Sequence, residues 1–205
     1  MLSVLLRAEP ATIPQAAEGL RALPATSVVP ALNTALASHA EWGTESAWRT
    51  AQSLAYRSII DLMFDFGDPS SLEPLDRVLA KTTNADLRNF LLLHIQQKAN
   101  TAFGAGFRPT LDEMAQNGPP AVQRSVLPVL VATAPASEKA SILKSFLGSP
   151  DSFTRAAACG ITAQVAHPAL AEQIKDLVAH AQSGAERLAC CHALQVLGLK
   201  DACPQ

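Results

Sequence analysis

The stretch Asp151-Ser-Phe-Thr-Arg155-Ala-Ala-Ala-Cys-Gly-Ile-Thr162 decides the fold, because its pattern returns at intervals along the chain. A residue that favours a helix start is followed four positions later by an arginine, and then by an apolar helical run. The segments Asn84-Ala-Asp-Leu-Arg88 and Ser183-Gly-Ala-Glu-Arg187 keep the same register. The arginines that fit the pattern are Arg49, Arg88, Arg124, Arg155 and Arg187. Their separations of 39, 36, 31 and 32 residues predict a chain built from repeats.

Each arginine-headed helix is preceded by another segment with helical periodicity. In one of them Leu72, Leu75 and Leu79 recur on one helix face. The five preceding segments are residues 28–38, 71–80, 110–116, 137–147 and 169–181. Each repeat is therefore expected to be a helix, a short turn and a second helix. A single pair cannot bury its apolar faces, so neighbouring pairs are expected to stack.

The ends of the chain fall outside this pattern. Residues 1–27 are expected to form an N-terminal capping segment with a helix from Ile13 to Leu23, and residues 28–199 the helical repeat domain. Residues 200–205 are expected to be a frayed tail. Pro128 lies inside a second helix and is expected to kink it or end it early.

Composition restricts the class of protein. Hydrophobic residues make up 48% of the 205 residues and charged residues 17%, which excludes disorder over most of the chain. The net charge of −2, from 18 acidic and 16 basic residues, disfavours nucleic acid as a partner. No apolar window approaches the ~20 residues of a membrane span. The cysteines Cys159, Cys190, Cys191 and Cys203 crowd into the C-terminal quarter and are expected to be reduced thiols in a cytoplasmic protein.

The repeat pattern, the pair Asp68–Pro69 and the turn Ser149–Asp151 resemble the HEAT-repeat family and its short bacterial members, over residues 28–199. The resemblance implies an all-α fold: a right-handed α-solenoid of about five stacked antiparallel two-helix repeats. An armadillo-like arrangement of the same helices is left open.

In that family a turn aspartate and the arginine often pair along the stack. The resemblance therefore implies a structural ladder for the five arginines, with acids retained here in Asp151 with Arg155 and in Asp86 with Arg88. A row of anion-binding arginines is the alternative.

Some residues are candidates for contact with a partner. The segment 101–109 reads as a loop between helix pairs, with two phenylalanines around a Gly-Ala-Gly. Asp61, Asp65 and Arg57 lie on one predicted helix earlier in the chain. The candidate partner-binding residues are Phe103, Phe107, Arg108, Asp61, Asp65 and Arg57. The alternatives are phenylalanines packed beneath a neighbouring repeat and aspartates at a solvated helix end.

Two other clusters have structural interpretations. Trp42 and Trp48 are expected to seal the end of the helical stack, and stacking on nucleic-acid bases is the alternative. Zinc binding by Cys190, Cys191 and His192 is disfavoured, because adjacent cysteines on a helix point ~100° apart and no metal-ligand spacing is present.

These observations predict a non-catalytic protein-binding scaffold or adaptor, in forms such as a toxin-neutralising immunity protein or a secretion-system accessory. The partner is expected to be another protein, and self-association as a subunit of a larger solenoid is a third option. The enzymatic alternative is a HEAT-like bilin lyase or alkylpurine DNA glycosylase. The chain has no His-Glu dipeptide, which excludes the di-iron hydroxylases of this fold. No catalytic, cofactor-binding or metal-binding residue is assigned.

Overall fold

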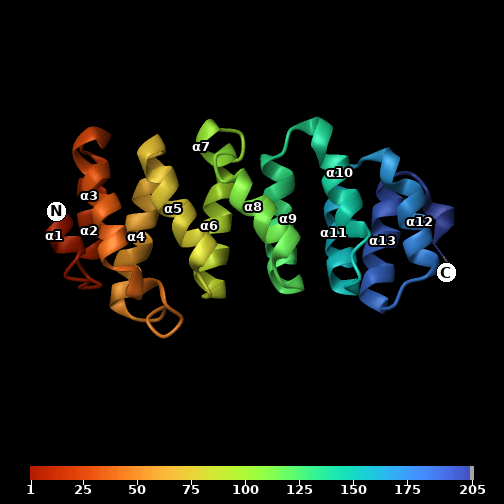
Figure 1. Cartoon of the computed structure of the whole chain (residues 1–205), viewed down its shortest axis with the longest axis horizontal. Helices are drawn as coiled ribbons and strands as arrows, with labels where there is room; N and C mark the ends of the chain where they lie inside the picture. Colours follow the sequence, from red (N-terminus) through yellow and green to blue (C-terminus); the bar gives the residue numbers. More distant parts are fainter. Residues whose placement is uncertain (204–205) are drawn as a thin grey trace. The chain divides into compact units, whose positions relative to one another are not determined.

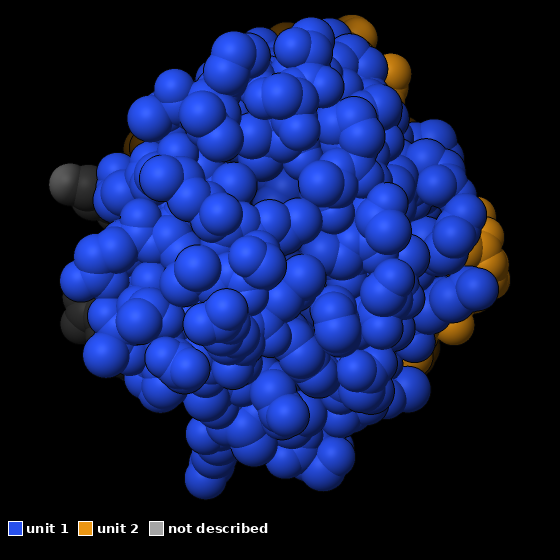
Figure 2. Space-filling model, turned by 90° about the vertical axis from the view of Figure 1, so that its left-hand side faces the viewer, with its two compact units in different colours: residues 1–110 blue, residues 111–205 orange. Residues whose placement is uncertain are grey.

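The computed structural model describes residues 1–203, and over these residues the chain is all-helical, without a strand (Figure 1). Its contacts divide it into two compact units, Met1–Thr110 and Leu111–Gln205 (Figure 2). The division falls inside the predicted repeat domain of residues 28–199, within one helix. Among the described helices, none is long and apolar enough to cross a bilayer.

Unit 1 is built around one central helix. Its elements are α1 (Leu2–Leu5), α2 (Ile13–Arg21), α3 (Ala25–Ser38), η1 (Ala40–Gly43), α4 (Ala51–Phe66), η2 (Pro69–Ser71), α5 (Leu72–Lys81), α6 (Ala85–Gln97), α7 (Ala102–Ala105) and the start of α8 (Arg108–Asn117). Helix α4 packs against α2, α3 and α6, while α3 also packs against α5. Ile59, Ile60 and Met63 of α4 are fully buried, so this helix supplies the middle of the core.

Unit 2 repeats the helix-pair pattern. After the end of α8 come α9 (Pro120–Thr133), α10 (Ala136–Leu147), α11 (Ser152–Val165), η3 (Pro168–Leu170), α12 (Ala171–Ala179), α13 (Gly184–Val196) and η4 (Lys200–Ala202). Helix α11 packs against α9, α10 and α13, and α12 packs against α10 and α13. Helix α9 passes through Pro128 and continues to Thr133, so the expectation that it ends early is wrong.

Most of the predicted helix starts are confirmed by their capping side chains. Asn84 accepts hydrogen bonds from the backbone of Asp86 and Leu87, while Asp151 and Ser183 cap α11 and α13 in the same way. The first repeat differs. Residues 40–50 form η1 and turns, so α4 begins after Thr50 and Glu45 is not a cap.

The cysteines are paired, and the prediction of reduced thiols is wrong. Cys159 of α11 is bonded to Cys190 of α13, with 4.8 Å between their Cα atoms, and Cys191 is bonded to Cys203. The two adjacent cysteines point to different sides of α13, so they serve different partners. The second bond ties the end of η4 to α13, so residues 200–203 are not the frayed tail expected there; residues 204–205 of that prediction lie outside the described residues.

Candidate functional site

The phenylalanines expected to contact a partner are part of the core of unit 1. Phe103 is 9% exposed and Phe107 is fully buried. Both rings lie 5.7 Å from the ring of Phe64, centroid to centroid. The prediction that they contact a partner is therefore wrong, and the packing alternative holds.

The physical reason is that residues 101–109 do not form a loop. Thr101 caps the short helix α7, and α8 begins at Arg108, which is half-buried. A Cβ atom at Gly104 would lie 2.1 Å from the carbonyl oxygen of Lys98, so only glycine allows the close approach that presses α7 onto α6.

The other candidates on α4 have partners inside unit 1. Asp61 lies 2.8 Å from Nε2 of His94 on α6, and Asp65 lies 2.7 Å from Nε of Arg21 on α2. The guanidinium of Arg57 lies 4.0 Å above the Trp48 ring and donates to the Trp48 carbonyl at 2.7 Å. These contacts tie α2, α4 and α6 together, and contact with a partner protein stays a prediction for these residues.

The tryptophans are not placed to stack on bases. Both Trp42 and Trp48 are buried, and Trp48 is covered by Arg57 on one side and has Phe90 at its edge. That they seal the end of the helical stack stays a prediction, because burial alone does not place them at an end.

The arginine ladder exists in unit 2, with other partners than predicted. Arg155 of α11 forms a two-point ion pair with Glu186 of α13, at 2.5 Å and 3.1 Å, and both side chains are buried. Asp151, predicted to pair with Arg155, instead accepts a hydrogen bond from Arg124 of α9 at 2.8 Å. Each arginine thus reaches the acid at the head of the next second helix along the chain.

The ladder is absent at the remaining positions. Arg88 donates to the carbonyl of Thr82 at 3.2 Å, rather than pairing with Asp86. Arg49 precedes α4 and is exposed, and Arg187 is exposed on α13. A continuous row of anion-binding arginines therefore has no support in the described residues.

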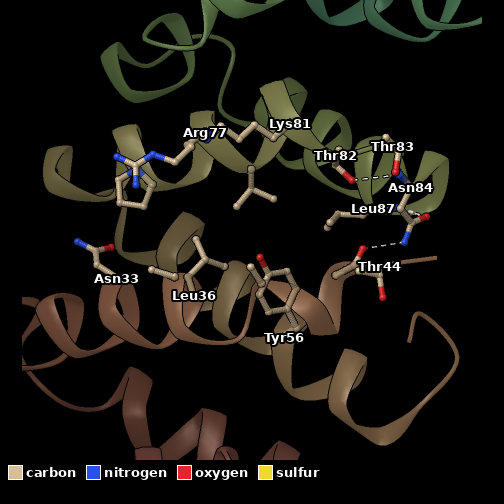
Figure 3. Close-up of a pocket in the computed structure, with 15 residues that line it drawn as sticks. Asn33, Leu36, Thr44, Tyr56, Arg77, Lys81, Thr82, Thr83, Asn84 and Leu87 are labelled. Carbon is tan, nitrogen blue, oxygen red and sulfur yellow. Dashed lines mark hydrogen bonds between the residues drawn. The ribbon is translucent and has the colours of Figure 1, made fainter. Parts of the chain in front are cut away.

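A cavity of about 420 Å³ lies in unit 1, between α3, η1, α4, α5 and the start of α6 (Figure 3). Leu36, Val78 and Leu87 supply apolar walls. The polar lining residues are Asn33, Thr44, Tyr56, Thr82, Thr83 and Asn84, and the basic ones are Arg77 and Lys81. No local sequence pattern marks this site, because its residues come from five elements that only the fold brings together.

Tyr56 is the unusual side chain in this cavity. It is 1% exposed, and its hydroxyl points into the open space between α3 and α5 (Figure 3). Among the described residues the hydroxyl has no hydrogen-bond partner, and it is accessible from the cavity rather than enclosed in the core. Burial raises the pKa of Tyr56 to about 12, and the charge of Glu41 adds to the effect.

The charges around the cavity are unbalanced. Arg77 and Lys81 lie on α5, and no carboxylate is among the lining residues. Arg77 pairs with Glu73 on its own helix, whereas Lys81 has no ion pair within the described part of the chain. Glu41 lies outside the lining, 3.6 Å from Nδ1 of His39, and its negative charge acts on the pKa of Tyr56. The cavity therefore offers one unpaired cation and one unpaired hydroxyl.

Metal binding has no candidate ligand set within residues 1–203, where no three His, Cys, Asp or Glu side chains cluster around a common point. No family model matches the chain, and neither a curated protein nor a solved structure matches it. Function is therefore argued from the chain's own geometry.

Proposed function

We propose that the chain is a non-catalytic protein-binding scaffold with stacked helix pairs of HEAT-like solenoid type. The packing within each unit supports this. In unit 1 the second helices α4 and α6 pack together, and the first helices α3 and α5 do the same. In unit 2 the second helices are α9, α11 and α13, and the first helices α10 and α12. Such two-layered stacking is typical of helical repeats, whose usual role is binding.

The observation that carries the proposal is the exposure of two large apolar side chains near the starts of two second helices of unit 2. Phe153 is 59% exposed and Leu188 is 74% exposed. They lie in the first two turns of α11 and α13, the same turns that the Arg155–Glu186 ion pair joins. Apolar side chains held outward by a rigid framework are characteristic of protein-interaction sites.

Each of these apolar side chains has an arginine close to it in space or in sequence. The guanidinium of Arg124 lies 5.8 Å from the ring centre of Phe153, and Arg187 precedes Leu188 on the exposed part of α13. Arginine and aromatic side chains dominate the binding energy of many interfaces. The partner is inferred to be a protein segment that combines apolar and acidic side chains.

The disulfides indicate the kind of cellular compartment in which the chain would bind this partner. Bonds between Cys159 and Cys190 and between Cys191 and Cys203 persist in oxidising compartments and are rare in reducing cytosol. We therefore infer an oxidising environment, instead of the cytoplasmic location expected from sequence. An immunity protein or a secretion-system accessory is a particular form of the proposal.

The test uses the full chain as bait in a lysate of its source, with and without nuclease, and identifies retained proteins by mass spectrometry. A stoichiometric, nuclease-resistant partner is expected for the wild type and for the control Leu54→Gln/Leu93→Gln, which removes exposed apolar side chains from unit 1. The variant Phe153→Ser/Leu188→Gln is expected to lose it. Circular dichroism confirms that each variant is folded.

Three outcomes would overturn the proposal. Retention that disappears with nuclease would indicate nucleic acid as the ligand. Equal retention by both double variants would move the site elsewhere. A dimer in light scattering that Phe153→Ser/Leu188→Gln converts to a monomer would identify a second copy of the chain as the occupant.

A further inference from the structure

We propose that the cavity of unit 1 binds a small organic anion with a flat apolar body, of the aromatic carboxylate or sulfonate class. This site does not include Phe153 or Leu188 of unit 2, and it does not rest on the proposed scaffold function. The cavity volume of about 420 Å³ lies within the range of small-molecule sites.

The unpaired hydroxyl of Tyr56 specifies an acceptor atom in the ligand. A tyrosine hydroxyl that faces a cavity and has no partner in the protein is available to donate to a bound group. Tyr56 is 1% exposed and its hydroxyl points into the cavity (Figure 3). A ligand oxygen in the cavity accepts from this hydroxyl without displacing a bond within the protein.

The direction of the Tyr56 ring is fixed by its neighbours. A Cβ atom at Gly43 would lie 2.9 Å from the Tyr56 ring and 2.9 Å from a methyl group of Leu87, so the backbone packs closely on both side chains. The amide of Asn84 donates to the Gly43 carbonyl at 3.0 Å and holds that backbone in place. A donor held in place before binding loses little entropy when the ligand arrives.

The charge of the lining selects an anion. Lys81 has no ion pair among the described residues, and Arg77 shares its charge with Glu73 at the surface. No acidic side chain lines the cavity, so an incoming anion meets attraction without a facing carboxylate. A cationic ligand would meet the opposite field.

The walls between the polar groups are apolar and select the body of the ligand. Leu36 of α3 and Leu87 of α6 line the space beside Tyr56 (Figure 3), and Val78 of α5 also lines the cavity. A planar hydrocarbon body would cover these side chains and remove their apolar surface from water. The combination of an apolar body and an anionic group distinguishes the ligand from inorganic phosphate or a sugar.

The experiment compares two fluorescent probes of nearly the same shape, anionic 8-anilino-1-naphthalenesulfonate and uncharged N-phenyl-1-naphthylamine. Titration of the full chain is expected to show one saturable site for the anion and at least about tenfold weaker binding of the neutral probe, as loss of a charge-assisted hydrogen bond implies. Equal affinity for the two probes, or no saturable site for the anion, would overturn the proposal.

Variants locate the site. Tyr56→Phe is expected to lower the affinity for the anionic probe about tenfold, and Lys81→Gln about fivefold. The affinity for the neutral probe is expected to change little in both variants. Lys144→Gln, an equal charge change on an exposed residue of α10, is the matched control and is expected to have no effect.

Filling the cavity separates specific from general binding of the dye. Val78→Phe is expected to abolish the binding of both probes. Ala40→Phe, at an exposed lining position, does the same from the rim if Val78→Phe fails to fold. Every folded variant must keep the wild-type circular dichroism, because partly unfolded chains also bind this dye. Undiminished dye binding in a folded, cavity-filled variant would overturn the proposal.

Discussion

The two units hold similar helix pairs together by different means. Unit 1 uses a cluster of stacked and edge-on rings, with Phe64 in contact with Phe103, Phe107 and His94, and its ion pairs between helices are partly exposed. Unit 2 joins its second helices by the buried Arg155–Glu186 ion pair and a disulfide.

The difference matters because ring packing responds weakly to solution conditions, whereas charges and thiols respond directly to pH and redox state. Helix pairs of one repeat pattern can therefore depend mainly on apolar packing in one unit, and on a buried ion pair and a disulfide that respond to pH and redox state in the other.

The largest expected effect follows from breaking the ion pair of unit 2. Arg155→Met leaves the buried Glu186 carboxylate without its partner and is expected to cost about 3–5 kcal/mol. Both tryptophans lie in unit 1, so tryptophan fluorescence follows unit 1 while circular dichroism follows all helices. Urea unfolding is expected to show an early loss of helix before the fluorescence changes.

A control keeps the arginine test specific. Arg77→Met removes an ion pair of exposed side chains in unit 1 and is expected to change stability by less than about 1 kcal/mol. If fluorescence and circular dichroism shifted together in Arg155→Met, the two units would unfold as one. That result would contradict the claim that the ion pair stabilises unit 2 separately from unit 1.

The second prediction concerns the disulfide between α11 and α13. The bond closes a segment of 31 residues, and its removal in Cys159→Ala/Cys190→Ala is expected to cost about 3–4 kcal/mol through the entropy of the unfolded chain. Dithiothreitol should reproduce the loss in the wild type. Non-reducing peptide mapping checks the pairing.

The other disulfide supplies the matched comparison. Cys191→Ala/Cys203→Ala opens a shorter closure of 12 residues and is expected to cost about 2–3 kcal/mol. A peptide map that joined Cys190 to Cys203 would contradict the separation of the two adjacent cysteines onto different sides of α13.

The third prediction uses two helical glycines with opposite surroundings. Gly104→Ala in unit 1 would place a Cβ atom 2.1 Å from the Lys98 carbonyl oxygen and is expected to cost about 1–3 kcal/mol. Gly160→Ala in the middle of α11 meets no atom within 4 Å and is expected to stabilise unit 2 by about 0.5–1 kcal/mol. Thermal unfolding of the two variants should move in opposite directions, and a shift of the same sign would show that the packing of α7 is misplaced.

The sequence predicted those features that local chemistry determines. The caps Asn84, Asp151 and Ser183 mark helix starts because their side chains bond backbone groups two or three residues away. The first helix of each pair was also recovered within a few residues, for example α10 at Ala136–Leu147 against the predicted residues 137–147.

Features that depend on distant parts of the chain were missed. The acid that pairs with Arg155 is 31 residues away, and the nearer Asp151 was chosen in its place. The partner of Cys159 lies at the same separation, one helix pair further on. The cavity around Tyr56 combines residues from Asn33 to Leu87, and no local pattern marks it.

The smallest expected effect is a difference in acid response, set by the carboxylates of unit 2. Burial acts to raise the pKa of Glu186, but the hydrogen bonds from Arg155 and from the backbone of Gln182 outweigh it, and the net pKa is below the ordinary value. The pKa of Asp151 is also lowered, first by the Thr154 hydroxyl. A lowered folded-state pKa gives stability that is present above the unfolded pKa and is lost as the pH falls through the folded value.

In unit 1 two carboxylates make opposing contributions to the pH dependence of stability. Burial raises the pKa of Asp76, and the charge of Glu73 adds to this, although a hydrogen bond from Thr110 acts the other way. Its contribution to stability therefore increases as the pH falls. The pKa of Asp68 is lowered by its bonds to Ser70, so this exposed carboxylate loses its contribution in acid. These two effects act in opposite directions, so unit 1 is expected to respond less than unit 2.

Urea unfolding at pH 6 and at pH 3 tests the difference. The circular dichroism transition of unit 2 is expected to move to lower urea at pH 3, because the stability from Glu186 and Asp151 is lost below the ordinary carboxylate range, while the fluorescence transition moves less. Glu186→Gln should reduce that shift, and Glu172→Gln, an exposed carboxylate on α12, should leave it unchanged. If the fluorescence transition moved further than the circular dichroism transition, unit 1 would be the more acid-sensitive unit, which would contradict the prediction.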